Sequence, residues 1–307
     1  MSKHRKGNPV NGWVNFNKPV GMSSTQAVGF VRRAFNAQKA GHGGTLDPLA
    51  SGVLPIALGE ATKTMQFSSL EAEKEYTFTV TFGTQTATDD TEGEALFTSD
   101  KRPSLAEVQA VMPQFMGEIT QLPPQYSALK IDGQAAYAIA RSGGEAALKT
   151  RQVTIHSLQL TATTGSENAL DSATFHAHVS KGTYIRSIAR DMGQTLGCYG
   201  HVSLLTRTRA GVFALEASVS KETLDKYLKT GENPSTFLQP NDIALADILA
   251  YVAEPKEVHQ LKAGVLLQRV HLQPGLRRVV TKHGVLVSLV DIDQTGTLRI
   301  VRNFNNE

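Results

Sequence analysis

The sequence predicts an α+β fold, with a mixed or antiparallel sheet flanked by helices and a small β-rich module at the C-terminal end. Three observations support this prediction. Apolar and polar residues alternate over 76–82, apolar residues recur at helical spacing after two capping boxes, and helical and extended segments are interspersed without strict βαβ repetition. A chain of 307 residues is long enough for one large domain and one small one.

The expected elements follow a basic tail over residues 1–9. In chain order they are a strand around 10–16, a helix opened by Ser23 and Gln26, a strand over 76–82, a helix opened by Ser104 and Glu107, strands near 152–161 and 173–180, and a helix through Ile185, Ile188, Met192 and Leu196. A serine followed three residues later by Gln or Glu forms a capping box, which justifies the first two helices. Period-2 alternation justifies the strands, and apolar residues at 3.6-residue spacing justify the last helix.

Loop and turn signals divide the rest of the chain. Consecutive prolines within 122–130 predict a loop, and the turn residues of 293–296 lie between two apolar runs, which predicts a hairpin. Pro234 and Pro240 indicate a boundary between about 235 and 250. We therefore expect a large domain over 10–240 and a small β-rich module over 250–307.

Positive charge is concentrated in two parts of the sequence. The net charge is only +3, but no acid precedes Asp47. A second basic stretch carries Lys181, Arg186, Arg190, Arg207 and Arg209. Such patches are typical of nucleic-acid binding, although solvated surface side chains give the same count.

Cysteine usage and hydropathy restrict the compartment. Cys198 is the single cysteine, which excludes an intrachain disulfide and a multi-cysteine zinc site and fits a reducing environment. The longest aliphatic run, over 53–58, is far too short to span a bilayer. The basic N-terminus is not followed by the apolar segment of a signal peptide. We expect a cytoplasmic protein that does not associate with membranes.

Asp47 is the candidate catalytic residue. It is the only acid in the first 59 residues and lies in the run Gly41-His42-Gly43-Gly44-Thr45-Leu46-Asp47-Pro48. Glycines let a backbone approach a ligand closely, and the surrounding cations would attract a polyanion. A simpler interpretation makes Asp47 the N-cap of a short helix that Gly52 ends. The two interpretations are compatible, because strained loops at helix starts also display reactive side chains.

Several familiar sites are excluded by the sequence. It has no G-x-x-x-x-G-K-[ST] loop and no dinucleotide fingerprint, and a zinc deaminase would need paired cysteines. His176 and His178 share a strand face, but no third ligand is evident, so we expect no metal site. The acidic turn over 89–94 lacks calcium-loop spacing, and Cys198 is interpreted as a buried thiol. We expect no cofactor.

What remains is a carboxylate together with the means to hold RNA. A uracil in a folded RNA must be flipped out, placed against an aromatic ring and held by cations on its phosphates. Tyr76 and Tyr184 are the candidate platforms, and Lys18, Arg186 and Arg207 are the candidate cations.

Six ordered motifs extend this pattern from about residue 10 to 212. They are Lys18-Pro19-x-Gly21-Met22-Ser23-Ser24; Ala40-Gly41-His42-x-Gly44-x-Leu46-Asp47-Pro48-Leu49-Ala50-x-Gly52; Gly59-Glu60-Ala61-Thr62-Lys63 with Tyr76; Tyr126-Ser127-Ala128-Leu129-Lys130; Ser180-Lys181-Gly182-Thr183-Tyr184-Ile185-Arg186; and Leu196-Gly197-Cys198 with His201, Val202, Leu205 and Arg207. In these motifs the sequence resembles the TruB family of tRNA pseudouridine synthases. The resemblance implies a pseudouridine-synthase-like sheet, a PUA-like C-terminal module, and cofactor-free isomerisation of uridine to pseudouridine at position 55 in the T-loop of tRNA.

The resemblance also implies roles for individual residues. Asp47 matches the family's catalytic aspartate, Tyr76 the tyrosine that stacks on the target base, and Arg186 the arginine that pairs with the aspartate. The expected substrate-binding residues are Lys18, His42, Tyr184, Leu205, Lys130 and Arg207. Of these, His42 resembles the residue that wedges under the flipped-out T-loop stack. Asp90 is the candidate second acid behind Arg186, although the family pattern commonly has an Asp where this chain has Ala87.

Other questions stay open at this point. The sequence does not decide whether Asp47 attacks ribose C1′, attacks the base or acts mainly as a base. The stretch 123–151 is expected to be a mobile clamp that orders over RNA, with Gly143 and Gly144 as hinges. The C-terminal module is either an RNA-binding element, with Arg277, Arg278 and Lys282 as candidates, or a stabilising cap.

Two rival functions are weighed against catalysis on RNA. A non-catalytic tRNA-binding or folding factor would have no physical need of Asp47, Tyr76 and Arg186 together. A uridine methyltransferase would need a donor-binding glycine loop and an activated thiol, and the sequence has neither. We expect a monomer that binds the T-arm of tRNA and needs no protein partner.

Overall fold

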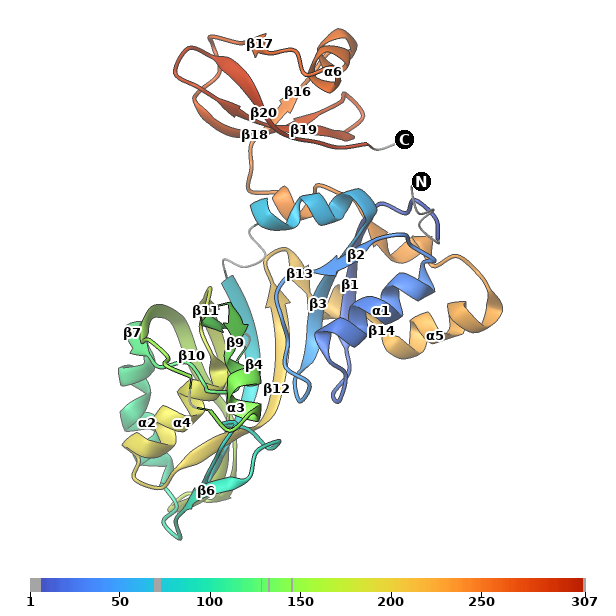
Figure 1. Ribbon diagram of the computed structural model, residues 1–307. Helices are drawn as coiled ribbons and strands as arrows, with labels where there is room; N and C mark the ends of the chain where they lie inside the picture. Colours follow the sequence, from blue (N-terminus) through green and yellow to red (C-terminus); the bar gives the residue numbers. More distant parts are fainter. Residues whose placement is uncertain (1–6, 69–72, 128, 132, 145, 306–307) are drawn as a thin grey trace.

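The computed structural model describes residues 7–68, 73–127, 129–131, 133–144 and 146–305. Positions 1–6 of the expected basic tail and positions 128, 132 and 145 of the expected clamp lie outside the described residues. Figure 1 shows a large body that carries most strands and helices, and a smaller β-rich module joined to it by a single passage of the chain. The predicted α+β class and β-rich C-terminal module are confirmed.

A mixed sheet forms the body. Its hydrogen-bonded order is β14 (Val219–Ser220), β1 (Gly12–Lys18), β3 (Ser51–Leu58), β12 (Gly200–Ala210), β4 (Glu73–Phe82), β11 (Ala169–Ser180), β10 (Arg151–Ser166) and β7 (Gly117–Gln121). The short strands β2 (Ala40–His42), β13 (Phe213–Ala214) and β15 (Leu238–Gln239) pair with β3, β12 and β1. The pairs β1–β14 and β3–β12 are parallel and the other pairs are antiparallel, so the predicted mixed sheet is confirmed.

The predicted capping boxes open two helices, α1 (Ser24–Ala34) and α2 (Leu105–Val111). In each, the serine before the helix accepts from the N3 backbone N–H, while the N3 side chain bonds the serine N–H. Helix α4 (Ile185–Thr195) begins as expected but carries no side-chain cap at Tyr184. The remaining α-helices in the described residues are α3 (Ala136–Arg141), α5 (Lys221–Thr230) and α6 (Pro255–Lys262).

One face of the sheet carries the main core. Tyr76, Phe78, Val80 and Phe82 of β4 all join a cluster that includes buried side chains of α1, α2 and α4. Phe78 stacks against Phe175 of β11 with ring centroids 5.4 Å apart. Burial of each such side chain contributes about 1.5–3 kcal/mol, so this face determines where the helices pack. The other face of β4 carries Thr77 and Thr79 and is polar, as strict alternation requires.

The C-terminal module is a second sheet with its own core. Its order is β16 (Ala250–Val252), β18 (Gly275–Val280), β19 (Leu286–Ile292), β20 (Thr297–Asn303) and β17 (Leu267–Gln268). The expected hairpin is confirmed, because β19 and β20 pair antiparallel across the turn of Asp293. The Thr295 hydroxyl and backbone N–H groups of the turn donate to the Asp293 carboxylate and lower its pKa to about 2.

Few polar contacts join the module to the body. Lys63 Nζ donates to the Asn303 carbonyl over 3.3 Å, and the Asn305 N–H donates to Glu60 over 2.7 Å. Leu245 and Ile248, which precede β16, pack into the module's core with Leu286. The domain limits at 240 and 250 stay a prediction.

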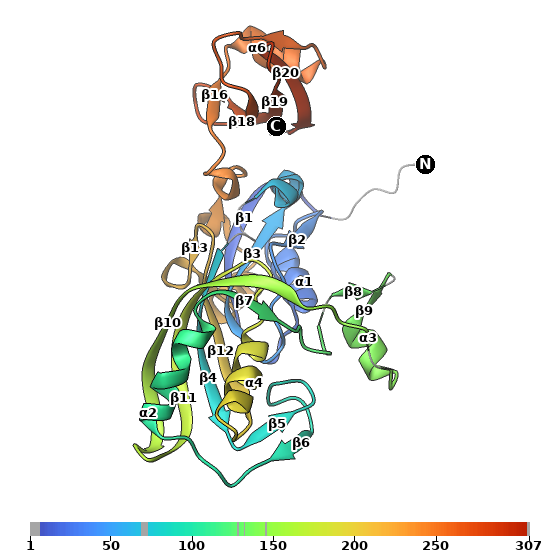
Figure 2. The same ribbon diagram turned by 90° about the vertical axis from the view of Figure 1, so that its left-hand side faces the viewer.

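The remaining short strands form two hairpins outside the main sheet. They are β5 (Thr84–Thr86) with β6 (Ala95–Thr98), and β8 (Lys130–Ile131) with β9 (Gln134–Ala135). Figure 2 shows β8, β9 and α3 projecting from the body beside α1 and β7. None of the helices in the described parts of the chain has the length and apolar character needed to cross a membrane.

Candidate active site

A cavity of about 300 Å³ opens on the helix-bearing face of the main sheet. It is lined by the loop 44–47, by Lys74 and Tyr76 of β4, by Leu129, by the segment 180–186 and by Leu205 of β12. The structure thus brings Asp47, Tyr76, Tyr184, Arg186 and Leu205 together, although they are far apart in sequence. Lys18, His42, Lys130, Arg207 and Asp90 were expected at the site but do not line the cavity.

The backbone around Asp47 is a turn and not a helix. The Ala50 N–H donates to the Asp47 carbonyl over 3.1 Å, and β3 begins at Ser51. The interpretation of Asp47 as the N-cap of a short helix is therefore wrong. Gly52 does not end a helix either, because it belongs to β3 and pairs with Arg207 of β12. The sequence pattern missed this because the pairing partner lies more than 150 residues away.

Ser24 fixes the loop from the start of α1. Its hydroxyl donates to the Leu46 carbonyl and accepts from the Leu46 N–H, both over 2.9 Å. The Gly21 N–H donates to the Pro48 carbonyl over 2.8 Å. The loop is thus held on both sides of Asp47, whose side chain is 34% exposed. A carboxylate displayed by a fixed backbone is suited to attack or proton transfer.

Arg207 lies beneath this loop and is fully buried. Its guanidinium donates to the carbonyls of Val53 over 2.7 Å and of Thr45 and Gly44 over 3.2 Å each. A side chain that is enclosed in this way is not displayed to an RNA phosphate. The structure shows Arg207 supporting the Asp47 loop, and its expected contact with substrate stays a prediction.

Lys18 holds the loop from the end of β1. Its ammonium donates to the carbonyls of Pro19, Met22 and Pro48, and the side chain is fully buried. Burial lowers the pKa of Lys18 to about 8, against the opposing effect of the Asp47 carboxylate, which favours the charged form. Like Arg207, Lys18 contacts backbone carbonyls and does not line the cavity.

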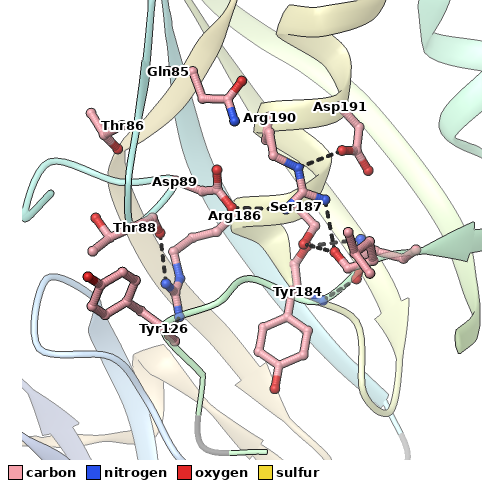
Figure 3. Close-up of polar contacts among 12 residues, drawn as sticks. Gln85, Thr86, Thr88, Asp89, Tyr126, Tyr184, Arg186, Ser187, Arg190 and Asp191 are labelled. Atoms are coloured by element: carbon pink, nitrogen blue, oxygen red, sulfur yellow. Dashed lines mark hydrogen bonds and ion pairs between the residues drawn. The ribbon is translucent and has the colours of Figure 1, made fainter. Parts of the chain in front are cut away.

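Arg186 links Asp47 to two other segments. Its Nε lies 3.0 Å from Oδ2 of Asp47, as an ion pair whose N–H is not aligned for a hydrogen bond. Its two terminal nitrogens donate to the Thr88 carbonyl over 2.8 Å and the Tyr126 carbonyl over 2.9 Å (Figure 3). Active-site contacts of this kind often align only when substrate is bound. The side chain is 3% exposed, so its direction is fixed.

A second carboxylate lies behind Arg186. Oδ2 of Asp90 is 3.6 Å from an Arg186 terminal nitrogen, and Asp90 is 2% exposed. Thr88 and the Glu92 N–H both donate to the Asp90 carboxylate, which fixes its orientation. Because Arg186 lies in the first turn of α4, its charge opposes the helix dipole, and flanking carboxylates offset this.

The adjacent Asp89 pairs with a different arginine. Asp89 has the positive φ of 59° that is rare outside glycine, and it forms an ion pair of 3.0 Å with Arg190, one turn after Arg186 on α4. Arg190 also pairs with Asp191 over 2.8 Å (Figure 3). Burial raises the pKa of Asp89 to about 6, although Arg190 acts in the opposite direction. Arg190 was not among the residues expected at the site.

Tyr76 forms the aromatic wall of the cavity. Its side chain is 8% exposed and belongs to the main core, so only part of the ring faces the opening. Burial raises the pKa of the Tyr76 phenol. Leu205 lies on the neighbouring strand, opposite Phe78, and adds an apolar contact to the same wall. A flat ring beside an aliphatic side chain suits a planar base.

Tyr184 is held in place by Gln121, a residue that was not expected at the site. The Gln121 amide accepts from the Tyr184 N–H over 2.8 Å and donates to its carbonyl over 3.1 Å, and Gln121 is 1% exposed. The Arg151 guanidinium lies 5.1 Å from the centre of the Tyr184 ring. These contacts bind α4 to β7 and β10, and no local sequence pattern could indicate them.

His42 and Lys130 lie away from the cavity lining. His42 ends β2 and pairs with Ile56, and burial lowers the pKa of its imidazole. Lys130 is exposed at the start of β8. Their expected contacts with substrate stay predictions. The predicted burial of Cys198 is confirmed, and burial raises the pKa of its thiol.

A fixed carboxylate paired with a buried arginine, beside an aromatic ring in a cavity, is the arrangement of an enzyme active site. A family model described as the N-terminal domain of TruB family pseudouridylate synthases matches residues 32–185. A second model, the tRNA pseudouridylate synthase B C-terminal domain, matches residues 186–246. The chain belongs to the TruB family.

Individual relatives agree with the family models. A Caulobacter protein named tRNA pseudouridine synthase B is 45% identical, with 99% of each chain covered. A protein of the same name from Novosphingobium aromaticivorans is 45% identical, over 96% of this chain and 98% of its own. The fold is shared with a chain in a solved H/ACA ribonucleoprotein bound to a substrate RNA containing 2′-deoxyuridine, at 23% identity, a TM-score of 0.71, and coverage of 99% of this chain and 92% of that chain.

Proposed function

We propose that this protein isomerises uridine to pseudouridine at position 55 in the T-loop of tRNA. The observation that carries the proposal is the ion pair between Asp47 and Arg186 in a cavity beside the ring of Tyr76. The names of the full-length relatives support the same reaction and the same class of substrate.

The chemistry requires a carboxylate and no external reagent. The C1′–N1 bond of the uridine breaks, C1′ bonds to C5 of the same base, C5 loses its proton and N1 gains one, so atoms and electrons balance without an external reagent. Asp47 is exposed enough to reach a nucleotide and is fixed by its backbone. It stabilises or captures the separated fragment, and Arg186 orients the charged carboxylate.

The base must leave the RNA stack to reach Asp47. Tyr76 then holds the flipped uracil on one side, with Leu205 adjoining, because both line the cavity with Asp47. Tyr184 and the segment 180–183, which includes Lys181, line the same cavity. Cations there attract the phosphates that flank the target nucleotide.

We also propose how the protein holds tRNA, where it acts and how its chain is divided into domains. The segment 123–151 acts as the clamp over the T-arm, and its two ends are joined because the Gln125 amide bonds both backbone groups of Ala146. The protein acts in the cytoplasm as a monomer, over a catalytic domain of 10–240 and a PUA-like module of 250–307. Equal protease sensitivity of the clamp with and without tRNA would argue against its ordering.

The deciding experiment measures pseudouridine in a T-loop minihelix under single-turnover conditions with no cofactor added. Asp47→Asn keeps the size of the side chain and removes its charge, and we expect the rate to fall by on the order of 10³-fold or more with RNA affinity retained. Asp171→Asn removes a charge from an exposed residue and serves as the matched control.

The rival hypothesis, that the protein is a tRNA-binding or folding factor without catalysis, predicts a different result. In that case neither the wild type nor Asp47→Asn forms product, and both bind the minihelix equally well. That outcome would overturn the proposed reaction. The rival is not favoured, because binding alone gives no reason to pair a cavity carboxylate with a buried arginine.

A further inference from the structure

The face of the sheet opposite the cavity carries a second cluster of chemically active side chains. Along β4, Lys74 and Tyr76 line the cavity, so Glu73 and Glu75 point to the other face. On the adjacent strand β11, His178 pairs with Glu75 in register and therefore shares that face. The proposed isomerisation uses none of these groups.

Glu73, His156 and His178 come together on this face. His178 Nε2 lies 3.0 Å from Glu73 Oε2, and His156 Nε2 lies 3.7 Å from Glu73 Oε1. The two imidazole rings have centroids 4.7 Å apart, and one ligand atom from each of the three residues lies within 4.8 Å of the others. Ligand atoms around a tetrahedral zinc ion are about 3.3 Å apart, so only small rotations are needed to bind one.

A β-bulge lies at His156, next to the cluster. In the pairing of β10 with β11, Ile155 lies opposite Val179 and Ser157 lies opposite His178, so His156 is the extra residue of a register shift. Two residues of β10, His156 and Ser157, thus follow Ile155 where β11 has only His178, and this leaves His156 beside His178. The three ligands come from β4, β10 and β11, which are neighbours in the sheet.

We propose that Glu73, His156 and His178 bind a divalent transition-metal ion. We expect this ion to be zinc, because two imidazoles and one carboxylate are a ligand set that zinc prefers. Zinc in proteins takes N and O ligands at about 2.0–2.2 Å in tetrahedral geometry, and water supplies the fourth position here. The expectation of no metal site rested on His176 and His178 lacking a third ligand. The structure supplies two further ligands from other strands and leaves His176 out, because His176 lies 3.5 Å from Glu75.

The ion has a structural role. It ties the first residue of β4 to β10 and β11, and Glu73 pairs with Ser180, a residue that also borders the cavity. A metal bound by the folded protein alone raises its thermal stability in proportion to the logarithm of the metal concentration. Catalysis does not pass through this site.

The test uses tag-free protein from which bound metal has been removed with a chelator. Zinc chloride is titrated into this protein in competition with a chromogenic chelator, which gives the zinc affinity and stoichiometry. The midpoint of thermal unfolding is measured in parallel. The wild type is expected to bind one zinc ion per chain at micromolar or lower concentration and to gain thermal stability. His156→Ala and His178→Ala should each weaken binding by more than about 100-fold, since even loss of an outer-shell partner costs 10- to 100-fold. Because the side chains of His156 and His178 are 36% and 33% exposed, both variants should fold, which the thermal midpoint in chelator checks.

His176→Ala is the matched control, since it removes a histidine from the same strand and the same face. It should leave the zinc affinity and stoichiometry unchanged. The proposal is overturned if the wild type binds no zinc below about 100 µM, or if His176→Ala weakens binding as much as His178→Ala does. In either case the cluster is a set of His–Glu ion pairs.

Discussion

Gly52 and Arg207 pair across two parallel strands so closely that no side chain fits at position 52. Gly52 has a φ of +101°, and a Cβ built there would lie 2.2 Å from the Arg207 carbonyl oxygen. The contact places the start of β3 directly beside the residue whose guanidinium supports the Asp47 loop. Glycine here is thus a requirement of the site's support.

Gly52→Ala is expected to lower the free energy of unfolding by about 3 kcal/mol, because it combines backbone strain with a main-chain clash. Gly231→Ala is the matched control, since Gly231 also has a positive φ of 74° but no atom within 4 Å of a built Cβ. It should lose only about 1 kcal/mol. Urea denaturation of both variants separates the clash from the strain, and equal losses would contradict the expected clash.

Arg207→Lys should lower turnover by on the order of 10-fold or more, because one ammonium cannot replace three guanidinium contacts to Val53, Thr45 and Gly44. The salt dependence of tRNA binding distinguishes this positioning role from a phosphate contact. Loss of a phosphate contact reduces the slope of log K against log salt by about one. The slope is therefore measured with Arg207→Met, which removes the charge: we expect it to be unchanged, and a reduced slope would show that Arg207 contacts a phosphate.

Asp90→Asn tests whether the second carboxylate orients Arg186. The variant is expected to lower turnover by about 10-fold with little effect on tRNA affinity, because Arg186 loses a charged partner 3.6 Å away. Asp89→Asn is the matched control: it is the adjacent residue in the same turn, but it pairs with Arg190. It should change stability more than turnover. A turnover for Asp90→Asn within about twofold of the wild type would remove Asp90 from the site.

Lys18 gives a pH dependence of stability with a defined sign. Its pKa is lowered from 10.5 to about 8 by burial, so between these values the unfolded chain binds more protons than the folded one. Stability contributed by this group therefore rises as the pH increases from about 8 to 10.5. The gain is about 3 kcal/mol at most.

Lys18→Met keeps the side-chain volume and removes the titrating group. The difference in unfolding free energy between wild type and variant should therefore change over this pH range and be constant from pH 6 to 7. Denaturant titrations at half-unit pH intervals measure it. A difference that does not vary between pH 8 and 10.5 would mean that Lys18 titrates normally in the folded protein.

Sequence patterns correctly predicted those elements whose signals lie within a few consecutive residues. The two capping boxes and the Asp293 hairpin lie within four or five residues and were confirmed. Strand β3 was not predicted, because Pro55 interrupts its apolar run and proline is rare in inner strands. Its placement depends on pairing with β1 and with distant β12.

The residues of the candidate site were likewise predicted only in part. The family motifs named Asp47, Tyr76 and Arg186, and the structure places all three at one cavity. The supporting contacts of Gln121 and Arg190 were not predicted, because each joins segments more than 60 residues apart. The burial of Arg207 was missed for the same reason: charge in a sequence gives no information on burial.

The convergence on Arg186 has a consequence for transplanting this chemistry to another protein. Its guanidinium contacts the Asp47 loop, the Thr88 turn and the Tyr126 segment, which no single stretch of chain supplies. A graft of the motif around Asp47 alone would carry the carboxylate without the arginine that orients it. A functional transfer needs at least these three segments and α4 in their mutual geometry, so the smallest portable unit of this enzyme is a domain.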